Sequence, residues 1–189
     1  MYDHLSPVEK KLIRVAQERP ELRQKIAVYL KKAVDNSKVV FVQAVISEND
    51  RMKIKSWISS KEDTPDSWGG WDIKNHHMTL EFFGNRGTIK DLEPYLNLIG
   101  KNVSLNIVGY VVDNKGVALL IDPPSAVSVD NAYPHITFAV RGESPKYSNL
   151  LLERAYDEGK ITPANLAVNA TIGWFDGKTR KDSFVAPKS

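Results

Sequence analysis

Two short segments that share one alternating pattern constrain most strongly how this chain can fold. Residues 76–84 read HHMTLEFFG and residues 134–140 read PHITFAV, so each carries His-x-Thr within an apolar run. Because side chains alternate across a β-strand, each segment predicts a strand with an apolar face toward the core and a polar face with an imidazole and a hydroxyl. The predicted polar faces carry His77, Thr79, Glu81, His135 and Thr137, and the predicted core faces carry Met78, Leu80, Phe82, Ile136 and Phe138.

The rest of the chain from residue 37 onward predicts an α+β domain. A β-branched run, further apolar segments and the turn Asp113-Asn114-Lys115-Gly116 indicate strands that are partly joined by hairpins. Strands of this kind mixed with helices favour the α+β class. The predicted helices cover 48–60, 91–99 and 147–158, and the further predicted strands cover 39–46, 103–112, 117–121, 167–176 and 183–186.

Residues 1–36 predict an N-terminal helical hairpin ahead of the domain at 37–189. Ser6-Pro7-Val8-Glu9 offers an N-cap serine, a proline at the first helical position and a glutamate at the third, and Pro20 begins a second helix. An accessory hairpin is the interpretation adopted, with an oligomerisation element or a tether as alternatives. The oligomeric state stays open.

Composition excludes several classes of protein. No apolar run approaches the roughly 20 residues that cross a bilayer, and the N-terminus lacks a signal-peptide core, so neither a membrane nor secretion is expected. The absence of cysteine excludes disulfides, thiolate metal sites and cysteine nucleophiles, and it agrees with a cytoplasmic location. A net charge of +3 permits an anionic ligand but is far from the basic surface of a duplex DNA-binding protein.

The paired triplets point to acid–base chemistry on a phosphate. Two imidazoles at one cleft can serve as general base and general acid, because the pKa of histidine lies near neutral pH. Threonine hydroxyls beside them can donate to the non-bridging phosphate oxygens. Such a site needs no metal or other cofactor, and the sequence has no clustered carboxylates or His-x-x-x-His pair suited to a divalent ion. The structural alternative is that each histidine is a satisfied residue on a sheet surface.

The segments His77-Met78-Thr79-Leu80 and His135-Ile136-Thr137-Phe138 resemble the duplicated signature of the two-histidine (2H) phosphoesterase superfamily. This family includes RNA-ligase-like cyclic phosphodiesterases and phage anti-CBASS nucleases, which destroy cyclic oligonucleotide immune signals. Over about residues 37–189, the resemblance implies two α+β lobes related by a pseudo-twofold axis, with antiparallel sheets around a central groove. It also implies that the two histidines form the acid/base pair and that the two threonines bind the phosphate. Which histidine is the acid stays open.

The resemblance further implies a substrate with a ribose 2′-oxygen. Either water opens a 2′,3′-cyclic phosphate, or the 2′-hydroxyl attacks a 3′–5′ linkage. The expected substrates are cyclic oligonucleotide signals, for which a phage-encoded protein would act in the host cytoplasm, or the 2′,3′-cyclic phosphates of RNA ends. The alternatives are a module that sequesters a nucleotide or RNA without turnover and, third, a virion or scaffold protein. The linkage and base that are preferred stay open.

Five further residues are candidates for binding the substrate. Glu81 shares the predicted face of His77, where it either orients an imidazole or contacts a base, or is a solvated strand-end glutamate. Each of the aromatic candidates either stacks on a nucleobase or packs within the protein. The aromatic candidates are Trp68, Trp71, Tyr133 and Trp174.

Overall fold

The computed structural model describes residues 38–178 and 180–181, and the predicted hairpin at 1–36 and the predicted strand at 183–186 lie outside them. The other predicted strands and helices are confirmed with small shifts of their ends, apart from the strand predicted at 167–176, which begins at Thr162. The helix predicted at 91–99 is instead a 3₁₀ helix over 89–95, with Pro94 inside it removing a backbone donor. The elements are β1 (Phe41–Ile46), α3 (Glu48–Ser59), β2 (Asp72–Ile73), β3 (His77–Phe82), η2 (Ile89–Tyr95), β4 (Asn102–Val112), β5 (Gly116–Asp122), β6 (His135–Val140), α4 (Tyr147–Asp157), β7 (Thr162–Phe175) and β8 (Arg180–Lys181).

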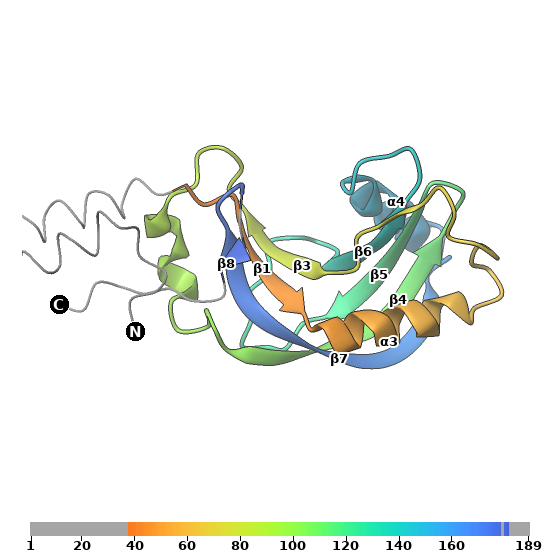
Figure 1. Ribbon diagram of the computed structural model, residues 1–189, viewed down its shortest axis with the longest axis horizontal. Helices are drawn as coiled ribbons and strands as arrows, with labels where there is room; N and C mark the ends of the chain where they lie inside the picture. Colours follow the sequence, from red (N-terminus) through yellow and green to blue (C-terminus); the bar gives the residue numbers. More distant parts are fainter. Residues whose placement is uncertain (1–37, 179, 182–189) are drawn as a thin grey trace, which may run out of the picture.

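The strands form one antiparallel sheet that closes on itself. Its order is β1-β3-β6-β5-β4-β7-β8, and a further pairing of β1 with β7 completes a ring of six strands. Figure 1 shows the strands curving into a saddle, with α4 over β5 and β6. The predicted α+β class is confirmed, but a single closed sheet takes the place of the two separate sheets that were expected.

The ring has an internal twofold relationship. The series β1, β3, η2, β4 is repeated as β5, β6, α4, β7, with α3 and β2 inserted into the first half. The strand pairings of the ring follow this repeat. The pairing of β1 with β3 corresponds to that of β5 with β6, and the pairing of β1 with β7 corresponds to that of β5 with β4. The pairings of β3 with β6 and of β4 with β7 each join equivalent strands. The pseudo-twofold axis passes between β3 and β6, where Met78 lies opposite Ile136. The two His-x-Thr segments are therefore equivalent positions on neighbouring strands.

A β-bulge follows each His-x-Thr triplet and reverses the alternation of side chains. Gln43 lies opposite Thr79 whereas Val42 lies opposite Glu81, so Leu80 is skipped; in the other half the pairing shifts between Val117 and Ala118. Beyond the first bulge Phe82 lies opposite Phe41 and is 59% exposed. The expectation that Phe82 faces the core is thus wrong, because a bulge exchanges the two faces of a strand.

The main hydrophobic core fills the inside of the ring. Apolar residues from all six strands belong to it, and α3 adds Ile54 and Ile58. Met78 and Ile136, the residues between each histidine and threonine, are fully buried, as the alternation predicts. The opposite, outer sheet face therefore carries the histidines and threonines. A second apolar cluster forms where α4 packs on the outer face around Ala118.

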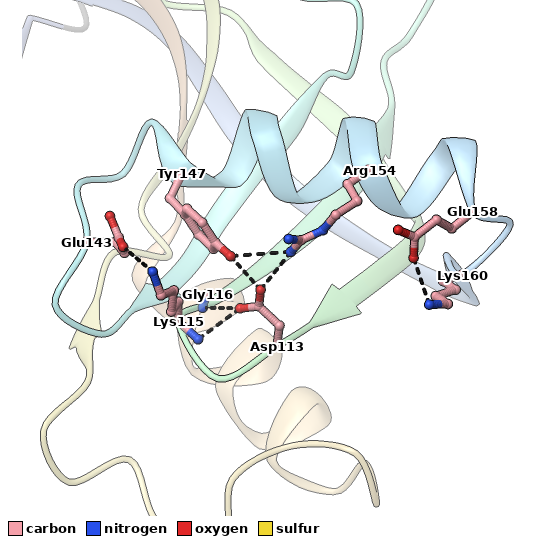
Figure 2. A network of polar contacts seen from close by, with 8 residues as sticks. All are labelled: Asp113, Lys115, Gly116, Glu143, Tyr147, Arg154, Glu158 and Lys160. Atoms are coloured by element: carbon pink, nitrogen blue, oxygen red, sulfur yellow. Dashed lines mark hydrogen bonds and ion pairs between the residues drawn. The ribbon is translucent and has the colours of Figure 1, made fainter.

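Asp113 holds α4 to the turn between β4 and β5, as Figure 2 shows. One of its carboxylate oxygens accepts hydrogen bonds from the backbone N–H groups of Lys115, at 2.9 Å, and Gly116, at 2.8 Å. The other accepts from the hydroxyl of Tyr147, at 2.5 Å, and the guanidinium of Arg154, at 2.9 Å. A Cβ at Gly116 would lie 2.8 Å from the Tyr147 ring, so this close approach requires glycine. The predicted hairpin is confirmed and also anchors the helix that follows β6.

Candidate functional site

The antiparallel pairing of β3 with β6 brings the two His-x-Thr triplets together. Because Met78 lies opposite Ile136 in an antiparallel pair, continuing this register by one residue would set His77 opposite Thr137 and Thr79 opposite His135, and the charge of His135 reaches His77. Side chains directly opposite each other in such a pair have Cβ atoms about 4.5–5.5 Å apart. The four side chains thus share one patch of the outer sheet face. We call this patch the histidine face.

His135 has a defined tautomer in its neutral form. Its Nδ1 lies 2.7 Å from the backbone oxygen of Tyr133, and a carbonyl can only accept, so Nδ1 carries a proton and donates it. The other ring nitrogen, Nε2, is left for proton transfer. Burial lowers the pKa of His135, while the contact with the Tyr133 carbonyl opposes that shift because it stabilises the imidazolium form.

His77 is held more strongly in its neutral form. Burial lowers its pKa to about 3, and positive charge at His76, Arg180 and His135 acts in the same direction. Its Nδ1 is buried and has no hydrogen-bond partner among the described residues. The ring stacks on Phe41 with centroids 5.3 Å apart. Two neighbouring imidazoles in different surroundings therefore differ in how readily they take up a proton.

His76, which precedes β3, also contributes to the electrostatics of the candidate site. Its ring centroid lies 5.1 Å from that of His77, and burial followed by the charge of Arg180 lowers its pKa to about 4. Arg180 lies on β8 opposite Phe175, and its charge reaches both histidines. The candidate site therefore has a positive potential, which favours an anionic ligand.

The two threonines have unequal surroundings in spite of the pseudo-twofold axis. The Thr137 hydroxyl donates to the backbone oxygen of Pro145 at 3.3 Å. Across the neighbouring strand Thr137 lies opposite Ala118, whereas Thr79 lies opposite Gln43. An amide in one half of the site therefore corresponds to a methyl group in the other.

An aromatic cluster that the sequence analysis did not predict adjoins His77. Phe41 lies at its centre, with ring centroids 6.4 Å from Phe82 and 5.0 Å from Phe175. The ammonium of Lys146, which is the N-cap of α4 in the other half, lies 5.8 Å from the centroid of Phe82. The bulge after Leu80 explains this cluster, because it turns Phe82 to the outer face. We call Phe41, Phe82 and Phe175 the aromatic cluster.

Two of the predicted substrate-binding residues take part in other contacts. Glu81 lies beyond the bulge and accepts a hydrogen bond from the Tyr95 hydroxyl at 2.7 Å; burial and this carboxylate raise the pKa of Tyr95. The bulge thus separates Glu81 from the face of His77. The Tyr133 ring packs on Tyr156, with centroids 5.5 Å apart, so its link to the site is its backbone oxygen.

The three candidate tryptophans pack within the domain. Trp68 and Trp71 meet edge to face with centroids 5.7 Å apart, and both pack against the main core. Trp68 also meets Phe138 at 4.9 Å and donates its indole N–H to the Ser59 hydroxyl at 2.7 Å, so these rings anchor the loop that carries them. Trp174 is 8% exposed and lies opposite Val42, on the core side of β7. These contacts favour the packing alternative for Trp68 and Trp174, whereas Trp71 also lines a surface hollow.

Two hollows on the described surface involve neither histidine. Each is bordered by Asp63 and Asp113, with volumes of about 430 and 500 Å³. Within residues 38–178 and 180–181, no group of three or more histidine or acidic side chains is arranged to hold a metal ion. No helix of this part of the chain is long and apolar enough to cross a membrane.

Comparison with known proteins finds a distant likeness to solved structures. No family model and no curated protein matches the sequence. Solved structures that match include the crystal structure of a fungal RNA kinase, with a TM-score of 0.44 and 13% identity over 95% of this chain. This chain spans 58% of the length of that kinase chain. The function is therefore inferred from the site residues themselves.

Proposed function

We propose that this chain is a phosphodiesterase that cleaves a nucleotide phosphodiester bond next to a ribose 2′-oxygen without a metal, the reaction of the 2H phosphoesterases. The observation that carries the proposal is the direct pairing of the two His-x-Thr strands across a pseudo-twofold axis. Two imidazoles and two hydroxyls on one face match what in-line displacement at phosphorus requires. One group must take the proton of the nucleophile, another must protonate the leaving oxygen, and donors must bind the remaining phosphate oxygens.

The difference between the two histidines supports an assignment of roles. His77 has a pKa lowered to about 3, and its buried Nδ1 has no described acceptor, so its neutral form is favoured. His135 donates Nδ1–H to a carbonyl, a contact that stabilises the protonated ring. Two titratable groups whose surroundings separate their pKa values are suited to opposite roles. His77 is therefore proposed as the base and His135 as the acid.

In the proposed first step the phosphate lies over the histidine face, and Thr79 donates to one of its non-bridging oxygens. Thr137 turns its hydroxyl from the Pro145 carbonyl to donate to another. His77 takes the proton of the 2′-hydroxyl as the bond from the 2′-oxygen to phosphorus forms. The bond from phosphorus to the 5′-oxygen breaks, and His135 gives that oxygen the proton of its Nε2. Hydrolysis of a 2′,3′-cyclic phosphate follows the reverse order with water as the second nucleophile.

The bound phosphate also changes the electrostatics of the site. Without a ligand, positive charge from Arg180 opposes protonation of His77. A phosphodiester anion offsets this repulsion and raises the pKa of both histidines, because an opposite charge favours the protonated form. Binding of substrate thereby makes His77 a stronger base than it is in the free protein.

The aromatic cluster supports a nucleotide as the substrate. Phe82 is 59% exposed and stacks on Phe41, which also stacks on the His77 imidazole, and Lys146 approaches the Phe82 ring from the other half of the fold. Exposed rings beside cationic groups are typical of sites that bind single-stranded nucleotides. The proposed substrates are cyclic oligonucleotides or RNA ends with a 2′,3′-cyclic phosphate.

A binding module that retains its nucleotide without turnover is the second candidate. The observation in its favour is the low pKa of His77, because a neutral imidazole with that pKa is a weak base. The two candidates predict different products. An enzyme releases a cleaved nucleotide, whereas a sequestering module returns the ligand unchanged.

The test is incubation with EDTA and a panel of 2′,3′-cyclic mononucleotides, cyclic dinucleotides, cyclic trinucleotides and short RNA, followed by chromatography of the products. We expect cleavage of at least one class, and His77→Ala and His135→Ala should each lower the rate by about 10²–10⁴-fold. His76→Ala is the neighbouring control: it removes an imidazole that is assigned no proton transfer, so it should retain turnover, although loss of its charge raises the pKa of His77. Undiminished turnover in the double variant of His77 and His135 would refute the enzyme.

A further inference from the structure

Gln43 is a buried amide with no partner in the described part of the chain. Its side chain is 0% exposed, and neither Nε2 nor Oε1 has a hydrogen-bond partner among the described residues. Buried polar groups in folded proteins are nearly always hydrogen-bonded, so an amide with both atoms unpaired calls for an explanation. A ligand that contacts both atoms once the side chain turns from this closed position is one such explanation.

Gln43 lies on the histidine face and not in the main core. Its neighbours on β1, Val42 and Ala44, belong to the core inside the ring, so alternation turns Gln43 outward. It lies directly opposite Thr79 on β3. Phe41, two residues earlier on the same face, stacks on His77. The unpaired amide is therefore next to the proposed phosphate-binding hydroxyl.

The other half of the fold shows that this position does not require an amide for packing. Ala118 is the pseudo-twofold equivalent of Gln43, since it follows the same bulge and lies opposite Thr137. It is fully buried and apolar, and α4 packs against it. An apolar side chain fits the equivalent position, whereas the Gln43 amide carries the cost of desolvation without a compensating bond.

We propose that Gln43 binds the substrate and sets its orientation, an inference that rests on the proposed function. Its Nε2 donates to a non-bridging oxygen of the phosphate, and its Oε1 accepts the single proton of the 2′-hydroxyl in the bound complex, before that proton passes to His77. A phosphate oxygen only accepts and a ribose hydroxyl can donate, so the two together satisfy both unpaired atoms. The site's pseudo-twofold symmetry alone would admit the substrate in either direction. The amide breaks that symmetry and directs the ribose with the nucleophilic hydroxyl to the half that contains His77.

The experiment compares the wild-type chain with Gln43→Met, a substitution of similar length that removes both polar atoms. The ligands are adenosine 3′-phosphate and 2′-deoxyadenosine 3′-phosphate, and the uridine pair is measured in parallel; binding is followed by calorimetry and stability by thermal unfolding. The wild type should bind the ribonucleotide about tenfold more tightly than its deoxy counterpart, and Gln43→Met should lose this preference. Its midpoint of unfolding should rise by about 2–4 °C, because an unpaired buried amide has been removed.

Ser148→Ala provides the matched control. The Ser148 hydroxyl is also fully buried without a partner among the described residues, but it belongs to α4 and not to β1 or β3. Its removal should likewise raise the midpoint of unfolding, and the ribonucleotide preference should stay as in the wild type. A packing role for Gln43 would give the same behaviour in both variants.

Two outcomes overturn the assignment of Gln43. One is that Gln43→Met keeps the wild-type preference for the ribonucleotide; the other is that the wild type binds none of the four nucleotides. The proposed function is tested separately by turnover of the substrate panel. Turnover by the wild type together with an unchanged preference in Gln43→Met would refute the role of Gln43 and leave the phosphodiesterase standing.

Discussion

The buried state of His77 makes the stability of the protein depend on pH in a measurable way. The pKa of a histidine in the unfolded chain is about 6.5, whereas that of His77 in the fold is lowered to about 3. Below pH 6.5 the unfolded chain takes up a proton that the folded chain does not, so stability is lost as the pH falls from 6.5 toward 3. At pH 5.5 the loss from this one residue is about 1.4 kcal/mol relative to pH 8.

The assay is urea unfolding of the wild type and of His77→Gln at pH 8 and at pH 5.5. Gln retains polar atoms but does not titrate, so the wild type should lose about 1.4 kcal/mol more than the variant between these two pH values. Protons taken up by His76, His135 and the carboxylates contribute to both proteins and cancel in the difference. Equal losses in the two proteins would refute the claim that burial keeps His77 neutral.

Three further predictions follow from the site and its supports. Phe82→Ala should raise KM for a nucleotide substrate about 5- to 100-fold, the range for losing one stacked base. The variant should lose little stability, because the Phe82 ring is 59% exposed. Steady-state kinetics measures the KM and thermal unfolding the stability, and an unchanged KM would contradict stacking. The profile of kcat/KM against pH should be bell-shaped, because His77 must be neutral and His135 must be protonated. Its maximum should lie below pH 6.5, because burial lowers the pKa of each histidine. A maximum above pH 7 would contradict the assigned roles. Asp113→Ala should lower the free energy of unfolding by about 2–3 kcal/mol in a urea titration, since it leaves several donors unpaired. Asp72→Asn is the control and should change this free energy little, because Asp72 belongs to an exposed ion pair. Equal effects of the two substitutions would contradict an anchoring role for Asp113.

Alternation of side chains made the strands and the core predictable. Met78 and Ile136 are buried as the period-two pattern requires, and the turn at Asp113–Gly116 joins two strands as its residues indicate. These features are local in sequence. The closure of the sheet into one ring depends on the pairing of β1 with β7, which brings together residues far apart in the chain, and no local pattern specifies it.

The surroundings of the histidines were harder to predict, for a physical reason. The bulge after Leu80 is marked by neither glycine nor proline, yet it exchanges the faces of Glu81 and Phe82. Whether a tryptophan stacks on a ligand or packs in the core depends on tertiary contacts, as Trp68 illustrates by meeting Phe138. The one sequence signal for Gln43 was available: it is the single polar residue in the otherwise apolar run at 39–46.

The proposed division of labour between the two histidines can be measured with a substrate whose leaving group needs no acid. The measurement is the rate of cleavage, in EDTA, of a ribonucleoside 3′-(4-nitrophenyl) phosphate and of the matching dinucleotide by the wild type, His77→Ala and His135→Ala. Loss of a general acid is compensated by a good leaving group, whereas loss of the general base is not. We predict that His135→Ala is impaired by about 10²–10⁴-fold on the dinucleotide and far less on the nitrophenyl ester, whereas His77→Ala is impaired on both. Wild-type rates on both substrates in both variants would contradict acid–base catalysis by this pair.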